Sequence, residues 1–528
     1  MKQQLLTSKY WLLLLVLSFV SCEPLQQDEN FAPTSIAPPT EEDAVNWKLI
    51  PGAPVSNLAQ VSVPVPTATT SSDYAAELET IRGLQKNLSS EQKKIIAKWS
   101  SGGVLRWNRY MRELVARFAL APAPLLDGTY PTPDAENPFS DPVFPFSNPP
   151  YAARAYSYVS VAQYQALQVA WFYKFKYNRP APHQVGEGIE ALVPKSTLPA
   201  YPSEDAVMSA VTCDLLKVLF PTAVEEITKM AAEQRNAALW SGKASPSDLS
   251  AGLALGKSIA ALFTARASGD GMRNAIGTKA QWMVLADSAS VRLKKIGRDV
   301  SKEVFWKSQD SPVRPPMLPF FGKVKGWILA PSDFTNRRPG PPPSTTSNEM
   351  AKELEEVKFY SKNSTRERIA IVHFWADGLG TYTPPGHWND IAANYIQQEG
   401  WSEIRSARAF ALLNMALHNA AVGCWEAKYY YFNPRPTQLD ASIKTLTGLP
   451  NFPSYPSGHS TFSASAAKVL TYLFPEGTEQ FKAWRDEASI SRLYGAIHYR
   501  IDTKAGVEHG SLLADPLIDF AAADGADN

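Results

Sequence analysis

Apolar side chains recur every three to four residues through much of the chain, which is the spacing of an amphipathic helix. No segment shows the sustained alternation of apolar and polar residues that is typical of a β-strand. The periodic segments that predict helices are 156–175, 205–219, 223–239, 248–265, 366–375, 390–398, 403–430, 460–473 and 479–492. We therefore expect an all-α protein built from packed helices.

Part of this helical pattern occurs twice. A shift of 254 residues aligns the two occurrences over about 100 residues. The aligned residues are Ala153-Arg154-Ala155-Tyr156 with Ala407-Arg408-Ala409-Phe410, Trp171 with Trp425, Lys174 with Lys428, Tyr201-Pro202-Ser203 with Tyr455-Pro456-Ser457, Phe220-Pro221 with Phe474-Pro475, and Asp248 with Asp502. One shift that aligns so many positions predicts two related helical bundles that arose by duplication. The alternative is that periodic apolar helices share common packing residues.

The two occurrences differ in their polar residues. The counterparts of Gly458, His459, Arg492 and His498 are Glu204, Asp205, Ala238 and Ala244. We therefore expect residues 76–345 to form a first bundle that is a degenerate copy. The second bundle, residues 346–528, is expected to carry the active site.

Some regions are predicted to lie outside the helical cores. Residues 23–75 are rich in Pro, Ser, Thr and Gln, which favours a flexible tether. Residues 122–150 and 313–345 are rich in proline, so they are interpreted as long surface connections of the first bundle.

Residues 1–22 have the features of an export signal. A basic start precedes an apolar run over residues 10–20, which is too short to span a membrane comfortably. Phe19-Val20-Ser21-Cys22 resembles a bacterial lipoprotein signal, in which the cysteine is lipidated. The alternative is an ordinary cleaved signal peptide. We predict an exported protein of the bacterial periplasm or outer membrane, attached to the membrane only through a lipid on Cys22.

The composition limits the possible partners. A net charge of +1 gives no reason to expect binding to nucleic acid, so any cationic function must be local. Beyond the signal only Cys213 and Cys424 remain, which allows one disulfide at most and leaves their pairing open. No later stretch is apolar enough for a transmembrane helix.

Two short stretches near the end of the chain combine an oriented histidine with an anion-binding backbone. His498 and Asp502 are four residues apart, so on a helix they would share one face, and the carboxylate would orient the imidazole. The stretch Pro456-Ser457-Gly458-His459 is typical of a helix start, where backbone N–H groups bind anions. His459 would lie beside such an anion, in a position for acid–base chemistry.

Cationic residues complete this constellation. Lys428 supplies a point charge, while Arg435 and Arg492 supply planar forks that match an oxyanion. Gly495 separates Arg492 from His498 and suggests a break that lets both side chains converge. The residues together predict a buried cationic pocket for a phosphate-like or vanadate-like oxyanion. Elsewhere, the stretch Pro384 to Asp390 with His387 could reach the pocket mouth, but we interpret it as a capped helix start. We consider Asp377 and Asp390 as possible partners of arginines.

The motifs Lys-x6-Arg-Pro, Pro-Ser-Gly-His and Ser-Arg-x5-His-x3-Asp resemble those of the superfamily that joins vanadium-dependent haloperoxidases and type-2 phosphatidic acid phosphatases. In the haloperoxidase branch the resemblance implies vanadate as cofactor, with hydrogen peroxide and a halide as substrates. It implies that His498 binds vanadium axially, that Lys428, Arg435, Ser457, Gly458 and Arg492 hold the vanadate oxygens, and that His459 is the acid–base group. Trp425 and Phe452 resemble residues of the halide region in fungal chloroperoxidases.

Two other functions stay open. In the phosphatase branch, which needs no cofactor, the resemblance implies that His498 attacks a phosphate ester and becomes a phosphohistidine, that His459 protonates the leaving oxygen and that Asp502 orients His498. The length of the two bundles favours the haloperoxidase branch. A non-catalytic oxyanion-binding lipoprotein is the other candidate, but a pure binder needs no oriented acid–base pair. Proteins of this kind often pair, so a homodimer is a further expectation.

Overall fold

The computed structural model describes residues 42–120, 126, 145–311 and 313–526. All regular secondary structure in these residues is helical, and they contain no β-strand, so the predicted all-α class is confirmed. Three predictions lie wholly or partly outside the described residues. They are the signal peptide with Cys22, the start of the tether, and most of the proline-rich stretch 122–150.

The described helices account for every periodic segment of the sequence. The α-helices are α2 (Ser72–Lys86), α3 (Ser90–Ser100), α4 (Gly103–Phe118), α5 (Pro149–Tyr177), α6 (Pro182–Val185), α7 (Glu204–Leu219), α8 (Val224–Trp240), α9 (Pro246–Ser268), α10 (Lys279–Lys295), α11 (Pro331–Asn336), α12 (Asn348–Lys362), α13 (Arg366–Phe374), α14 (Thr383–Glu399), α15 (Glu403–Tyr431), α16 (Pro436–Leu439), α17 (Gly458–Leu473), α18 (Thr478–Tyr494) and α19 (Arg500–Ala521). Short 3₁₀ turns are η1 (Glu42–Asn46), η2 (Pro145–Ser147), η3 (Met272–Asn274), η4 (Phe321–Lys323) and η5 (Pro475–Gly477). Two helices, α5 and α14, begin seven residues before their predicted starts, because prolines stand in their first turn, where a missing N–H is tolerated.

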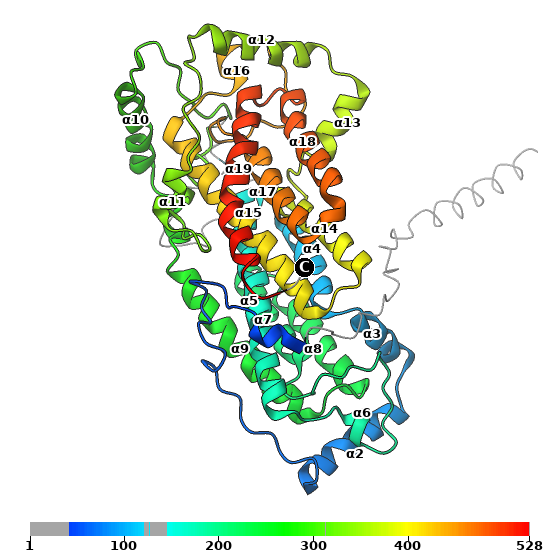
Figure 1. Cartoon of the computed structure of the whole chain (residues 1–528). Helices are drawn as coiled ribbons and strands as arrows, with labels where there is room; N and C mark the ends of the chain where they lie inside the picture. The colour runs from blue at the N-terminus through cyan, green and yellow to red at the C-terminus, as the bar shows by residue number, and fades with distance from the viewer. Residues whose placement is uncertain (1–41, 121–125, 127–144, 312, 527–528) are drawn as a thin grey trace, which may run out of the picture.

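Five helices of the first bundle recur in the second, each beginning 254 residues later. The pairs are α5 with α15, α6 with α16, α7 with α17, α8 with α18, and α9 with α19. The backbone also repeats, since the Tyr201-Pro202 and Tyr455-Pro456 peptide bonds are both cis. Figure 1 shows the two sets as a lower and an upper group of helices. The structure therefore contains two related bundles, as the sequence repeat predicts.

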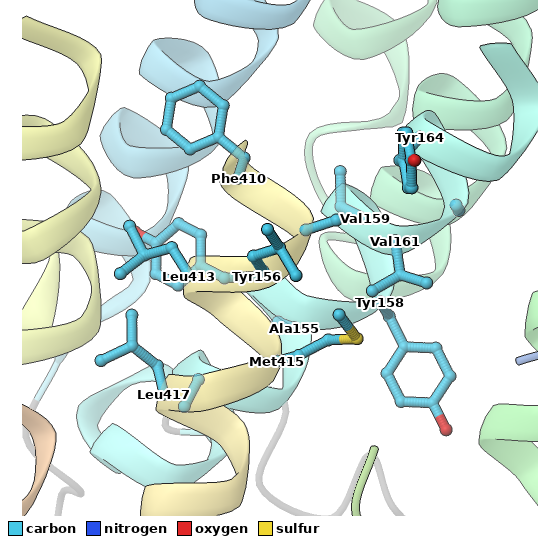
Figure 2. Close-up of a cluster of buried hydrophobic side chains, with 14 of the residues drawn as sticks. Ala155, Tyr156, Tyr158, Val159, Val161, Tyr164, Phe410, Leu413, Met415 and Leu417 are labelled. Carbon is cyan, nitrogen blue, oxygen red and sulfur yellow. The ribbon is translucent and has the colours of Figure 1, made fainter. Parts of the chain in front are cut away.

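The two bundles meet along the central helices α5 and α15. Figure 2 shows Tyr156 of α5 and Phe410 of α15, which are counterparts in the repeat, in one cluster of buried apolar side chains. Asn414 Nδ2 donates a hydrogen bond of 2.9 Å to Oγ of its own counterpart, Ser160. A contact between equivalent residues places a pseudo-two-fold axis at this point of the interface.

Each central helix is also tied by a buried ion pair to the residues after the last helix of its own bundle. Arg154 Nε lies 2.7 Å from Asp270 Oδ2, and Arg408 Nε lies 2.8 Å from Asp524 Oδ2. Both pairs are again 254 residues apart. Because one partner left alone would be an unpaired buried charge, these pairs hold the ends of α9 and α19 against the bundle centre.

The predicted flexible tether is wrong for residues 47–63. Trp47, Val55 and Val63 are buried in the main apolar core. The backbone of Val55 exchanges two hydrogen bonds with the side-chain amide of Gln165 on α5, at 3.1 and 2.9 Å. The prediction failed because the segment is mostly polar in composition, although a few widely spaced apolar residues in it are buried in the core.

The proline-rich stretch 313–345 is likewise more than a surface connection. Phe321 and Trp327 are buried in the core. The Trp327 backbone exchanges two hydrogen bonds of 2.9 Å with the side-chain amide of Asn419 on α15, and its Nε1 donates to Ser157 Oγ on α5 at 2.9 Å. This stretch therefore fastens both central helices.

Cys213 and Cys424 lie buried in α7 and α15, and both are free. None of the described helices combines the length and the apolar character that crossing a membrane would require.

We predict that Arg408→Met lowers the free energy of unfolding by about 3–5 kcal/mol, because it leaves Asp524 as an uncompensated buried charge. Chemical denaturation followed by circular dichroism measures this change. Arg117→Met removes the exposed pair with Glu226 and is the matched control, for which we expect about 0–1 kcal/mol. Equal effects of the two substitutions would contradict the structural role of the Arg408 pair.

Candidate functional site

The predicted site residues converge at one end of the second bundle. Lys428 lies in the last turn of α15, Arg435 caps the start of α16, and Arg492 lies in the last turn of α18. The helix starts of α17 and α19 supply Ser457, Gly458, His459 and Asp502, and the loop before α19 supplies His498. The structure brings all of them into one cluster and adds Trp425 and Phe452 as its apolar wall.

Lys428 fixes the loop that precedes α17. Its Nζ donates to the carbonyl oxygens of Pro453, Ser454 and Pro456 at 2.8, 2.8 and 2.5 Å. The side chain is fully buried, and this burial, aided by the neighbouring Arg435, lowers the pKa of Lys428 to about 7. An anion in the cluster would raise this pKa and keep the ammonium charged.

The two arginines are buried among neutral partners. Arg435 donates from Nε to Phe452 O at 3.1 Å and from Nη1 to Ile497 O at 2.8 Å, while its Nη2 has no partner. Arg492 donates from Nη2 to Val372 O at 3.2 Å. Burial lowers the pKa of both arginines to about 10, which still leaves them charged at neutral pH. The cluster therefore holds more positive charge than its neighbouring carboxylates, Asp502 and Asp377, offset.

His498 is held in a defined orientation by Asp502. Its Nδ1 lies 2.8 Å from Asp502 Oδ2, which also accepts hydrogen bonds from Ser454 Oγ and from the Tyr499 N–H. The expectation that His498 lies on the same helix as Asp502 is wrong, because α19 begins at Arg500. The turn that caps this helix brings the pair together instead.

The electrostatic environment keeps His498 neutral. Burial and the charges of Arg435 and Lys428 hold the pKa of His498 well below its usual value. Burial also raises the pKa of Asp502 to about 6, against the hydrogen bond from Ser454. With Asp502 on Nδ1, the His498 Nε2 presents a lone pair toward the arginine side of the cluster, where Arg435 Nη1 lies 3.0 Å away.

The start of α17 forms the opposite side of the cluster. Ser457 is the N-cap, and its Oγ accepts a hydrogen bond from the Ser460 N–H at 3.4 Å. A side chain at Gly458 would meet only the Trp425 ring, at 3.7 Å, so the space above this backbone is open. His459 follows, with a buried Nε2 that has no partner. Burial and Arg492 hold the pKa of His459 well below its usual value, so this imidazole is neutral as well.

Two aromatic rings form an apolar wall beside the cations. The Trp425 and Phe452 rings are tilted against each other with centroids 4.9 Å apart. The Phe452 centroid lies 5.0 Å from Lys428 Nζ and 5.0 Å from the Arg435 guanidinium carbon. The wall excludes water from one side of the cluster and strengthens the field of its charges.

A cavity of about 1260 Å³ borders the cluster on the His459 side, and its lining includes Trp375, Asp377 and His387. His387 Nδ1 lies 3.0 Å from Asp377 Oδ1, and its ring stacks on Trp375 at 4.4 Å. Asp377 also faces Arg492. The interpretation of this stretch as only a capped helix start is therefore incomplete, because His387 also lines the cavity and pairs with Asp377. Asp390 pairs instead with Arg112 on α4.

The donor set fits an oxyanion. The cluster combines three buried cations, the N-terminus of α17 with open space at Gly458, and the unpartnered Arg435 Nη2 and His459 Nε2. A tetrahedral phosphate or vanadate would satisfy these donors and offset the charge. His498 Nε2 would face the central atom of such an anion.

Comparisons with known proteins match part of the sequence and the overall fold. Residues 408–517 match the family model of the PAP2 superfamily. No curated protein sequence matches the chain. The fold resembles the crystal structure of a bacterial vanadium-dependent iodoperoxidase, with a TM-score of 0.54 and 23% identity over 72% of this chain and 92% of that chain.

The fold also resembles a bacterial vanadium-dependent chloroperoxidase in two crystal structures. The TM-score is 0.51 at 15% identity for the holo-type structure, over 74% of this chain and 96% of the other. For the apo-type structure it is 0.50 at 13% identity, over 70% and 94%. At this level of identity the likeness establishes the helical fold. Residues 408–517 thus match the PAP2 superfamily model within a helical fold like that of these two haloperoxidases.

We predict that sulfate binds the cluster less tightly as pH rises through about 7. Because the pKa of Lys428 is about 7, its ammonium group loses a proton above this pH. Lys428 must then take up a proton from water when the anion binds, and this uptake weakens binding as pH rises. The affinity should therefore fall by up to about tenfold per pH unit. Ionisation of Asp502, with its pKa of about 6, acts in the same direction. Isothermal titration calorimetry across this range measures the effect, because the charge of sulfate stays constant.

Lys428→Met is the matched variant for this measurement. It should weaken sulfate binding at low pH and flatten the dependence above about pH 7. A wild-type affinity that does not change with pH, or a Lys428→Met variant with the same slope, would contradict the assignment.

Proposed function

We propose that this cluster binds vanadate and that the protein is a haloperoxidase-like enzyme that oxidises a halide with hydrogen peroxide. The observation that carries the proposal is the neutral, oriented His498, whose Nε2 faces a group of buried cations. A neutral imidazole nitrogen can bind a metal centre, and its carboxylate partner fixes the ring and increases its basicity.

The residues around His498 would hold the vanadate oxygens. Lys428, Arg435 and Arg492 would supply charge, and Ser457 and the Gly458 N–H would supply hydrogen bonds at the start of α17. When bound, vanadate would supply the Lewis acidity that activates peroxide toward a halide. The chain's own part is to orient the anion, offset its charge and exclude water through Trp425 and Phe452.

His459 would transfer the proton that the reaction requires. Oxidation of a halide by hydrogen peroxide to a hypohalous acid and water consumes one proton. The neutral imidazole lies beside Arg492 and against the backbone of Trp375 and Ala376, which line the large cavity. It could take a proton from the peroxide and return it to a leaving oxygen.

The comparisons favour the haloperoxidase branch over a phosphatase. The two structural neighbours are a vanadium-dependent iodoperoxidase and a vanadium-dependent chloroperoxidase, and this chain covers 92% or more of each. The resemblance therefore includes both bundles and not only the 110 residues of the PAP2 superfamily match. The identity of the halide is left to measurement.

A phosphatase is the second candidate, and the same histidine supports it. Asp502 orients His498, and its Nε2, which Arg435 Nη1 contacts at 3.0 Å, could attack phosphorus once a phosphate ester takes over that contact. His459 could protonate the leaving oxygen. The cation cluster would stabilise the transferred phosphoryl group without any change of geometry.

We further propose that the enzyme is exported and attached to a bacterial membrane through Cys22. The proposal rests on the sequence of residues 1–22 alone. Metabolic labelling with a radioactive fatty acid tests it, and a Cys22→Ser variant that is labelled as strongly as the wild type would overturn it.

We predict that His498→Ala lowers vanadate-dependent halide oxidation by at least about 100-fold, since it removes the imidazole that would bind the metal centre. The assay follows oxidation of iodide, bromide and chloride by peroxide with and without added vanadate. His183→Ala, in α6 of the first bundle, is the matched control and should leave the rate unchanged.

A parallel assay of phosphate-ester hydrolysis separates the two candidate functions. Hydrolysis that vanadate inhibits, without vanadate-dependent peroxidase activity, would assign the protein to the phosphatase branch. Absence of both activities, together with sulfate binding that His498→Ala does not alter, would overturn both enzymatic readings.

We predict that His459→Ala lowers turnover by about 100- to 10,000-fold, the usual range for loss of an acid–base group. Sulfate affinity should change by less than about tenfold, because His459 is neutral and the cations remain. Steady-state kinetics and calorimetry on the same preparation test both expectations. An equal loss of binding and turnover would mean that His459 only shapes the anion site.

A further inference from the structure

The imidazole of His459 is oriented by the turn that follows α13. Burial lowers the pKa of this imidazole, and hydrogen bonds to the backbone of Ala376 and Trp375 act in the opposite direction. A backbone carbonyl group that raises the pKa of a histidine accepts a proton from its ring. Because the buried Nε2 has no hydrogen-bond partner, the ring nitrogen that donates is Nδ1. The turn therefore selects the tautomer of His459 that carries its lone pair on Nε2.

The backbone of this turn leaves both carbonyl groups available to the imidazole. The N–H groups of Trp375 and Ala376 donate back into α13, to Ile371 O and His373 O, both at 3.2 Å. Outside the helices, none of the described backbone N–H groups donates to the carbonyl oxygen of either residue. The next residue, Asp377, has a φ of 45°, in the left-handed region that non-glycine residues rarely adopt. Such a backbone persists only where its surroundings hold it.

The indole of Trp375 holds one side of the turn. Trp375 is 1% exposed, and its ring stacks on the His387 ring with centroids 4.4 Å apart. Its Nε1 donates a hydrogen bond of 2.8 Å to Glu487 Oε1. Glu487 lies on α18, the helix that also carries Arg492. This hydrogen bond therefore ties the turn to the helix that supplies one of the buried cations.

The side chain of Asp377 holds the other side of the turn. Its Oδ1 and Oδ2 lie 3.0 and 3.2 Å from Nδ1 of His387, which belongs to α14. Asp377 is buried and also faces Arg492. Both residues that flank Ala376 are thus fixed by side chains of other helices, and the carbonyl groups that meet His459 lie between the two attachments.

We propose that Glu487 and His387 are positioning residues for His459. Glu487 acts through the indole of Trp375, and His387 acts through the carboxylate of Asp377. Together they keep the carbonyl groups of the turn on Nδ1 of the imidazole, so that the Nε2 lone pair stays available for proton transfer. The inference rests on the proposed acid–base role of His459, but the protonation of its ring can be measured without any reaction.

Nitrogen NMR of the intact protein with isotope-labelled histidine measures this protonation directly. The chain has seven histidines, and His459→Gln identifies the signals of His459. In the wild type we expect a protonated Nδ1 and an unprotonated Nε2. Glu487→Leu and Trp375→Phe each remove the hydrogen bond between these two side chains and should populate the other tautomer. Glu487→Gln keeps an acceptor for the indole and should retain the wild-type signals.

Steady-state kinetics of halide oxidation give the second measurement. Glu487→Leu should lower kcat by about tenfold, as loss of an outer hydrogen-bond partner commonly does. The KM for peroxide should change by less than about threefold, because the anion site keeps its three cations. His387→Phe keeps a ring against Trp375 but removes Nδ1, and we expect a similar loss of kcat.

Trp388→Phe is the matched control. It removes the N–H of a neighbouring buried tryptophan, which donates to Ser463 Oγ at 3.0 Å and not to Glu487, so the nitrogen signals and kcat should stay unchanged. A wild-type His459 that is protonated on Nε2 overturns the inference. So do wild-type nitrogen signals in both folded Glu487→Leu and Trp375→Phe, or equal effects of Trp375→Phe and Trp388→Phe. Absence of peroxidase activity would overturn the proposed function, while the nitrogen signals would still decide the positioning.

Discussion

Three cationic side chains, those of Lys428, Arg435 and Arg492, are withdrawn from water at one end of the second bundle, and their described hydrogen-bond partners are neutral. Burying unpaired charge is costly, so a fold keeps such a group only when other interactions hold it and an anion offsets it. Here the carbonyl groups of the loop before α17 hold Lys428, and the loop before α19 holds Arg435. The rest of the site follows from this constraint.

The same cations set the state of the histidines. Burial and nearby positive charge depress the pKa of both His459 and His498, so each imidazole carries a lone pair at neutral pH. Asp502 orients His498, and its own carboxyl is held by the start of α19 and by Ser454. An oxyanion, a nucleophilic or metal-binding nitrogen and an acid–base group can thus occupy a space that water does not share.

The two bundles share one framework but place different negative charge beside its buried lysine. Both bundles place a helix start, a buried lysine and a cis tyrosyl-prolyl bond in the same relation. In the second bundle Gly458 leaves room for an external anion, whereas in the first Glu204 carries the anion on the chain itself. The packing between α5 and α15 does not depend on whether glycine or glutamate begins the next long helix, because it uses apolar counterparts such as Tyr156 and Phe410 (Figure 2).

The sequence by itself determined the helical class, the repeat and the identity of the cluster. Helical periodicity is a local property that the sequence shows directly, and it recurs in both copies when the chain is aligned with itself at a shift of 254 residues. Motif spacing identified His498 and Asp502 as a pair, because four residues keep two side chains close in a helix or in the turn that caps one.

Only the tertiary structure decided what these residues meet. Trp47 and Trp327 lie in segments whose composition is typical of loops, yet both are buried, because the central helices offer apolar and amide partners far away in the sequence. The pair of His387 with Asp377 likewise depends on which elements meet in the fold. Burial and pKa are properties of the surroundings that long-range packing creates, and residue spacing does not contain them.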